Sequence, residues 1–176
     1  MKRFTLFFTL AVLSFLPSFG QDDMESKIEQ FVQERLVFDI QGQYAKRHGT
    51  FLAYEVNLGY NITPKLYAYA LSGKLWQLRQ EDGIRSYCSA NILGGGMGYR
   101  LLGCSKEKVS LDLRLSLAQS VGSNSLNCTV YDGQLRFRLG GKHFVPTVGA
   151  GFKHVHSHTA GMPTHNYPYI AFGFGF

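Results

Sequence analysis

Four histidines gather near the carboxyl end of the chain, at His154, His156, His158 and His165. The first three alternate along the sequence, so an extended backbone would turn their imidazoles to one side. Neutral imidazoles at that spacing could share Zn²⁺, Ni²⁺ or Cu²⁺. No carboxylate follows to complete a site, because the last acid of the chain is Asp132. We hold a loop-bound metal at His154, His156 and His158 as one hypothesis, and a polar, pH-sensitive surface loop as the other.

The segments that must position these residues alternate between apolar and other side chains. The clearest runs from Val109 to Ala118, where Val and Leu alternate with polar or small residues. A period of two predicts β-strands with one apolar face. Strands are expected at 37–46, 50–62, 66–78, 88–102, 109–118, 128–140, 143–153 and 167–176. In the third of these, the expected outward residues are Tyr67, Tyr69, Leu71 and Leu75.

The final strand puts Ile170, Phe172, Phe174 and Phe176 on one face. A soluble strand seldom exposes three phenylalanines at an open edge, because such an edge aggregates. A strand that closes a barrel in lipid needs that face. The ending resembles the carboxy-terminal signature of bacterial outer-membrane β-barrels, which implies that these four residues form a signal read by barrel-assembly machinery. The expected fold is all-β: an eight-stranded antiparallel up-and-down transmembrane barrel in contact with outer-membrane lipid.

The amino-terminal residues are typical of an exported protein. Met1–Arg3 is basic, and Phe4–Leu16 is apolar but shorter than the roughly 20 residues that a spanning helix needs. Residues 22–36 carry an apolar stripe at helical spacing, which predicts a short amphipathic helix, with a partly disordered extension as the alternative. The expected segments are a signal peptide at 1–20, the helix segment at 21–36 and the barrel at 37–176.

The connections between the expected strands fit a membrane barrel in a Gram-negative envelope. Those after 50–62, 88–102 and 128–140 are short, whereas those after 66–78, 109–118 and 143–153 are long, the first of them being 79–87. Only the first connection, 47–49, is shorter than this pattern predicts. Bacterial outer-membrane barrels have even strand numbers, short periplasmic turns and longer outer loops. Both termini are therefore expected in the periplasm. A soluble barrel with an apolar interior is the alternative.

If the apolar face meets lipid, the opposite face fills the interior. The expected inward residues are Asp39, Gln41, Glu55, Asn57, Lys74, Arg100, Asp112, Arg114, Asp132, Gln134, Arg136, Arg138 and Lys153. Eight strands leave an interior just wide enough for side chains, and buried charges must be paired. We expect an ion-pair network that plugs the lumen, formed by Glu55, Arg100, Asp112, Arg114, Asp132, Arg136 and Arg138. Because bases outnumber acids in the inward set, a narrow pore is the alternative.

The three cysteines fall on different ends of this topology. Cys88 and Cys128 lie at the outer ends of their strands, and Cys104 lies in a periplasmic turn. Export permits disulfides, so one interpretation pairs Cys88 with Cys128, and the other is three free thiols.

Composition argues little for nucleic acid as a partner. Loss of Lys2 and Arg3 with the signal peptide lowers the formal charge from +6 by two, to +4. That excess is mild, and no nucleic-acid partner is expected.

Two partial motifs resemble enzymes that modify lipid A. His48, Asp82 and Ser86 resemble the loop residues of the palmitoyl-transferring barrels, but Asp82 and Ser86 are not adjacent as they are there. His156-Ser157-His158 resembles the His-x-Ser of the deacylating barrels, yet His158 stands where the serine nucleophile should be and no acid follows. A nucleophile needs a base that a third group orients. We therefore expect no catalytic residues and keep lipid A modification as the alternative function.

A second resemblance covers about the middle third of the chain. The stretch 96–103, a charged turn and then 109–113 resemble TraO-type outer-membrane proteins of conjugative elements, as do Tyr67-Ala68-Tyr69 and Trp76. The resemblance implies a part in conjugal transfer, with no catalytic residues to carry over. The expected function is a non-enzymatic outer-membrane barrel with a plugged polar lumen, whose outer loops contact protein partners.

Overall fold

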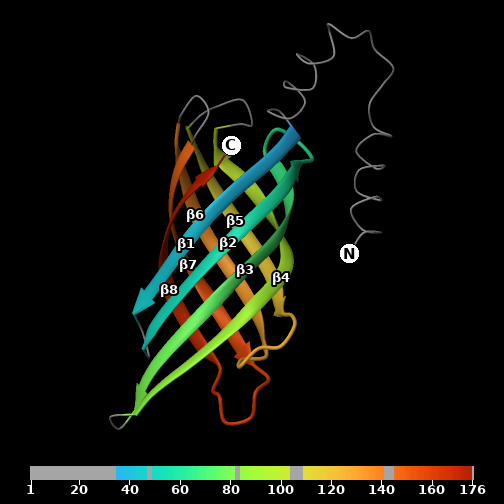
Figure 1. The fold of residues 1–176 in the computed structure, drawn as a ribbon. Helices are drawn as coiled ribbons and strands as arrows, with labels where there is room; N and C mark the ends of the chain where they lie inside the picture. Colours follow the sequence, from blue (N-terminus) through green and yellow to red (C-terminus); the bar gives the residue numbers. More distant parts are fainter. Residues whose placement is uncertain (1–34, 47–48, 82–83, 104–108, 141–144, 176) are drawn as a thin grey trace, which may run out of the picture. The chain divides into compact units, whose positions relative to one another are not determined.

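The chain forms eight strands in the computed structural model, which describes residues 35–46, 49–81, 84–103, 109–140 and 145–175. The strands are β1 (Leu36–Lys46), β2 (Thr50–Asn61), β3 (Leu66–Glu81), β4 (Ile84–Leu102), β5 (Val109–Ser120), β6 (Cys128–Leu139), β7 (Val145–Ser157) and β8 (His165–Gly175). Each strand pairs antiparallel with its neighbour in sequence, and β1 pairs with β8 from Asp39↔Gly175 to Tyr44↔Ile170. The predicted closed, eight-stranded antiparallel barrel is confirmed (Figure 1).

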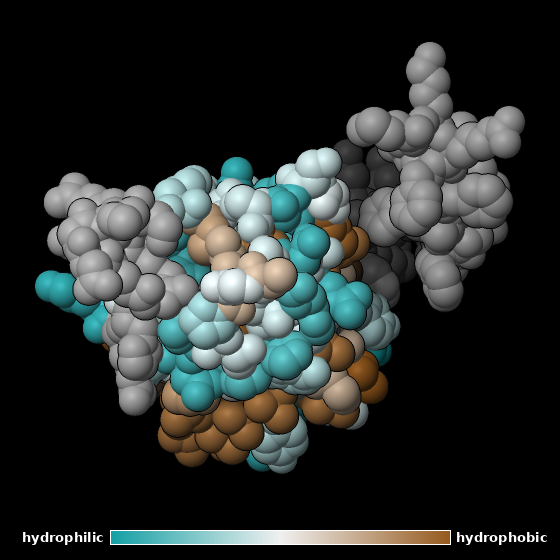
Figure 2. All heavy atoms as spheres, turned by 90° about the horizontal axis from the view of Figure 1, so that it is seen from below, coloured by the Kyte–Doolittle hydropathy of each residue, from teal (hydrophilic) through white to brown (hydrophobic). Residues whose placement is uncertain are grey.

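The two ends of the barrel differ in their connections. One end, at the top of Figure 1, carries the start of β1, the end of β8, the connection β2–β3, the ends of β4 and β6 and the starts of β5 and β7. We call it the terminal end. The opposite end, which we call the loop end, carries the segments 121–127 and 158–164, the end of β3 and the start of β4. Viewed from the loop end, polar residues spread across the barrel mouth and apolar residues lie at its sides (Figure 2).

Side chains alternate between the interior and the outer wall, as a period of two requires. In β1, the buried residues are Val37, Asp39, Gln41, Gln43 and Ala45, and the residues between them are exposed or half-buried. β2 and β8 repeat the pattern from end to end. In β8 the inward positions from Ala171 to Gly175 are small, and Ile170, Phe172 and Phe174 face out, while Phe176 lies outside the described residues.

The first of the predicted long loops is not a loop. We expected residues 79–87 to connect two strands, but β3 and β4 stay paired as far as Glu81↔Ile84. Only 82–83 separates the two strands. The predicted alternation of short and long loops therefore fails at this connection, because the hairpin lengthens its strands instead. Likewise, β7 continues through His154 and His156 to Ser157, where a loop was expected from 154 onward.

The predicted facing of the third strand is wrong. Tyr67, Tyr69, Leu71 and Leu75 are buried inside the barrel, and Lys74, which was expected inside, lies on the outer wall. The inward tyrosines fit because the facing positions of β4 are glycines. A Cβ on Gly96 would come within 2.6 Å of Tyr69 Cζ, and one on Gly98 would come within 2.1 Å of Tyr67 Cζ.

The predicted signal peptide at 1–20 lies outside the described residues. So does the segment 21–34 of the predicted helix, and Leu36, the last residue of that prediction, belongs to β1. No helix among the described residues has the length and apolarity to cross a membrane.

Replacing Gly98 with alanine tests the packing of the tyrosines. The new methyl group would displace the Tyr67 ring, which is 0% exposed and whose hydroxyl is bonded to Asp112 and Arg136. Overpacking of this kind costs about 1–3 kcal/mol, which urea unfolding should detect. Gly133→Ala is the matched control, because its Cβ would lie 3.5 Å from Leu115, an ordinary contact. Equal stability of the two variants would contradict the close packing.

Candidate functional site

The interior holds its most concentrated charge around Arg136. Arg136 Nη1 lies 2.8 Å from Asp39 Oδ2, and Nη2 lies 3.0 Å from Asp112 Oδ2. Arg114 Nη1 pairs with the other Asp39 oxygen at 3.2 Å. All four side chains are at most 3% exposed. Because buried charges are costly unless paired, these four residues must be satisfied together.

Register explains how this cluster, which we call the Arg136 network, is assembled. Asp112 on β5 stands directly opposite Arg136 on β6, so the two form a cross-strand pair on the inner face. Asp39 reaches the same arginine from β1, on another part of the wall. Neutral donors complete the carboxylates: Asn57 Nδ2 donates to Asp39 Oδ1 at 2.8 Å, Ser110 Oγ to Asp112 Oδ1 at 2.9 Å and Tyr67 OH to Asp112 Oδ2 at 3.1 Å.

A second cluster forms around Lys153, and we call it the Lys153 network. Lys153 Nζ forms ion pairs with Glu55 Oε1 and, at 3.3 Å, with Asp132 Oδ2. It also donates to Gln43 Oε1 at 2.6 Å. Tyr169 OH donates to both Asp132 oxygens at 2.9 and 3.0 Å. Lys153 and Asp132 are again cross-strand neighbours, whereas Glu55 comes from β2.

Two glutamines extend the hydrogen bonding across the lumen. Gln41 Nε2 donates to Glu55 Oε2 at 2.7 Å, and Gln134 Nε2 donates to Gln41 Oε1 at 3.0 Å. Of the predicted ion-pair residues, the structure therefore brings Glu55, Asp112, Arg114, Asp132 and Arg136 into two networks. It adds Asp39 and Lys153 as direct partners.

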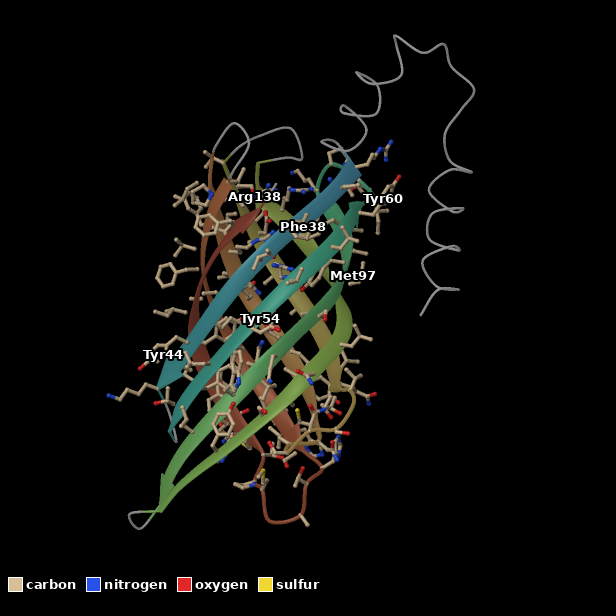
Figure 3. The ribbon with its side chains drawn as sticks, in the orientation of Figure 1. Phe38, Tyr44, Tyr54, Tyr60, Met97 and Arg138 are labelled. Carbon is tan, nitrogen blue, oxygen red and sulfur yellow. The ribbon has the colours of Figure 1, made fainter. Side chains whose placement is uncertain are left out.

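The remaining predicted network residues lie nearer the terminal end. Arg100 Nη2 donates to Asn61 Oδ1 at 2.8 Å and Nη1 donates to the Pro64 carbonyl at 3.0 Å. Its guanidinium also lies 4.9 Å from the centre of the Tyr67 ring. Arg138 is half-buried on β6, two residues closer to the terminal end than Arg136 (Figure 3). Neither arginine belongs to the ion pairs of the Arg136 network or the Lys153 network described above.

Sequence reasoning missed an apolar plug toward the loop end of the interior. Its largest fully buried members are Phe51, Leu75, Ile92, Leu126, Val130 and Tyr167. Phe51 stacks on Tyr167 with ring centres 4.6 Å apart, and Gln77 Nε2 donates to the Tyr167 hydroxyl at 2.5 Å. Leu126 comes from the β5–β6 segment, whose backbone bonds Ser89 of β4. Phe51, Ile92 and Val130 occupy inward positions in the alternating pattern of the sequence. The polar inward residues of the same strands, however, indicated a polar interior.

The histidines lie in a row, although not as a three-ligand site. His154 and His156 alternate along β7, and the ring centres of His156 and His158 are 4.9 Å apart. No three His, Cys, Asp or Glu side chains in the described part of the chain are grouped so as to hold a metal ion. Each ring instead meets a neighbouring side-chain oxygen: His154 Nδ1 with Asn166 at 2.6 Å, His156 Nδ1 with Thr164 at 3.2 Å and His158 Nε2 with Thr129 at 2.9 Å.

The sequence left open a Cys88–Cys128 disulfide or three thiols, and the structure has Cys88 and Cys128 as buried thiols. The Cys88 thiol points toward Gln77, with Sγ 3.5 Å from Oε1 and 3.8 Å from the carbonyl oxygen. Cys104 lies outside the described residues.

The partial enzyme motifs form no described catalytic contact. His48, Asp82 and the Ser86 side chain lie outside the described part of the chain. Ser157 Oγ accepts from the Thr159 amide at 3.2 Å and donates to the Thr159 carbonyl at 3.5 Å, so its described bonds are to backbone.

Comparison with solved structures shows a similarity at low sequence identity. The N-terminal β-barrel domain of OprF from Pseudomonas aeruginosa matches with a TM-score of 0.47 and 13% identity, over 81% of this chain and 98% of that one. No family model matches the chain, and no curated protein matches it. We therefore infer function from this chain's own wall and interior.

Arg136→Met tests whether the Arg136 network holds the barrel together. The substitution leaves Asp39 and Asp112 without their shared arginine, and breaking a buried pair from one side costs about 3–5 kcal/mol. Urea unfolding in lipid vesicles, followed by the fluorescence of the single tryptophan, should show a loss in that range. Lys46→Met, at an exposed position, should change stability by less than about 0.5 kcal/mol. A loss below about 1 kcal/mol in Arg136→Met would contradict the role of the network.

Proposed function

We propose that the protein is a non-enzymatic barrel of the bacterial outer membrane with a plugged lumen. The observation that carries the proposal is the reversal of ordinary polarity: charges are buried inside and large apolar residues cover the wall. Soluble monomers rarely expose contiguous apolar surface of more than a few hundred Å². Exposed apolar residues occur on all eight strands, among them Ile40, Leu58, Leu78, Met97, Leu115, Leu135, Phe152 and Phe172.

Aromatic side chains support a membrane boundary at both ends of the wall. Tyr60 lies near the terminal end, and Tyr44 and Tyr54 lie closer to the loop end, all on the outer wall (Figure 3). Tyr and Trp are enriched where a membrane meets water, because one end of the ring is apolar and the other is wet. A belt of aliphatic residues between aromatic girdles is the arrangement expected of a barrel in lipid.

The packed interior supports a structural role rather than catalysis or transport. The Arg136 and Lys153 networks occupy one part of the lumen and the apolar plug another. In the described residues, Arg114, Arg136 and Lys153 point at the buried carboxylates of Asp39, Glu55, Asp112 and Asp132. The narrow-pore alternative requires those ion pairs to open.

The orientation and assembly route are further parts of the proposal. Both chain termini would lie in the periplasm, with the loop end outside the cell. Barrel-assembly machinery would recognise Ile170, Phe172, Phe174 and Phe176. The first three are exposed on the outer face of β8. The loops at the outer end would meet protein partners. The most specific version of this role is a part in conjugative transfer, which the sequence resemblance alone implies. The mating frequency of a donor strain that lacks the gene would test it.

An arginine on the apolar wall tests membrane insertion. Leu115→Arg places a charge on the outer face of β5 at mid-strand, where Arg costs about 2–4 kcal/mol at the bilayer midplane. Gln119→Arg is the matched control on the same face near the strand end, where the cost falls to about 0–1 kcal/mol. We expect Leu115→Arg to lose most of the heat-modifiable folded band on a denaturing gel after refolding into vesicles, and Gln119→Arg to keep it.

Equal folding of the two arginine variants would contradict insertion, because a wall in water would accept both. Recovery of the wild-type barrel in solution without detergent would contradict it as well.

Single-channel recording tests the plugged lumen. A lumen filled by two ion-pair networks and an apolar plug should pass no sustained current in a planar bilayer. Lys153→Ala removes the base shared by Glu55 and Asp132 and should increase brief openings above the wild-type level. A stable conductance in the wild-type protein would favour the narrow pore instead.

A further inference from the structure

Lys74 is a charged residue on the outer wall. It stands on β3 between outward neighbours Ser72 and Trp76, and its side chain is only half-buried. Within a wall that faces lipid, an ammonium group is expensive unless it reaches polar headgroups. Long lysine side chains solve this by laying their stem on apolar surface and extending the charge to the interface. The position of Lys74 therefore calls for an anionic partner at the membrane surface.

The surroundings of Lys74 form a cluster of aromatic rings and hydrogen-bond donors. Lys74 Nζ lies 5.6 Å from the centre of the Trp76 ring, and the rings of Tyr54 and Trp76 are 5.6 Å apart. Lys74 is paired across the sheet with Tyr54 on β2 and with Asn91 on β4. Since directly opposite residues share a face, the exposed Asn91 amide lies beside the lysine. We call Tyr54, Lys74, Trp76 and Asn91 the Lys74 cluster.

The distribution of charge on the wall favours an anionic occupant. Every acid whose side chain the structure describes, namely Asp39, Glu55, Asp112 and Asp132, points into the barrel. The outer face of the described strands bears Lys46 and Lys74 toward the loop end, with no described carboxylate to neutralise them. An oxyanion at the Lys74 cluster would meet an ammonium group and neutral N–H donors and, among the described side chains, no repelling acid.

We propose that the Lys74 cluster binds the phosphate group of a phosphorylated glycolipid in the outer leaflet. Lys74 supplies the charge, Asn91 donates a hydrogen bond from its amide, and Trp76 and Tyr54 pack against the sugar and the upper acyl chains. The inference rests on the proposed membrane insertion and on the loop end facing outward. It assigns the ligand to one position on β2–β4, where a charge on the wall lies beside aromatic rings and an exposed amide.

Native mass spectrometry of the detergent-solubilised protein tests the assignment, with bisphosphorylated lipid A as the probe. Lys74→Met keeps an apolar stem against Trp76 and removes the charge. One lysine near an anionic surface contributes about 1 kcal/mol, so affinity should fall roughly fivefold. Lys65→Met removes an equal charge in the β2–β3 turn at the terminal end and should leave affinity within about twofold. Enzymatically dephosphorylated lipid A should bind no better to wild type than to Lys74→Met.

Three results would overturn the assignment: unchanged affinity in Lys74→Met, an equal loss in Lys65→Met, or equal binding of dephosphorylated lipid A. Tighter retention of phosphatidylglycerol than of lipid A would overturn the choice of a glycolipid. Heat modifiability of each variant in vesicles is measured in parallel. If wild type and the variants fold, insert and bind lipid A equally well, the result contradicts only the lipid site proposed at the Lys74 cluster. If wild type does not insert, the result contradicts the proposed function itself.

Discussion

The fold depends on pairing charges that cannot be left alone inside a closed wall. Arg136 joins carboxylates from β1 and β5, and Lys153 joins carboxylates from β2 and β6, so each network ties together strands that are distant in sequence. Leaving any one member unpaired would cost several kcal/mol. The networks therefore select the strand register and the facing of the strands that supply them, because a shift of one residue would turn those charges outward.

That choice of facing determines the surface. Once polar residues occupy the inside of β1, β2, β5, β6 and β7, strict alternation sends Leu, Ile, Val and Phe to the outside. In water, such an apolar wall would cause the protein to associate. In a membrane, the same wall makes favourable contact with the lipid chains. The interior and the wall are thus two consequences of one pattern, and the proposed location follows from both together.

Alternation in the sequence was sufficient to predict the strand count and the inward charges of β5, since Asp112 and Arg114 lie between leucines whose facing is unambiguous. It failed on β3, where tyrosines and leucines occupy inward positions while alanines, a serine and Lys74 face out. Hydropathy alone orients such a strand the wrong way. The deciding contacts are non-local: Tyr67 needs Asp112 and the space at Gly98, and neither can be seen within the strand itself. The Arg136 and Lys153 partnerships were beyond sequence reasoning for the same reason, because they depend on which residues meet across the lumen.

The most direct test of the account is the quenching of a tryptophan on the wall by lipid. In a Trp76→Phe background, tryptophan at Leu115 would sit at mid-strand on the outer face of β5. In vesicles of lipids brominated on their acyl chains, its fluorescence should fall strongly, and aqueous acrylamide should quench it little. Efficient quenching by acrylamide with no effect of the brominated chains would place this face in water and contradict the barrel's insertion in a membrane.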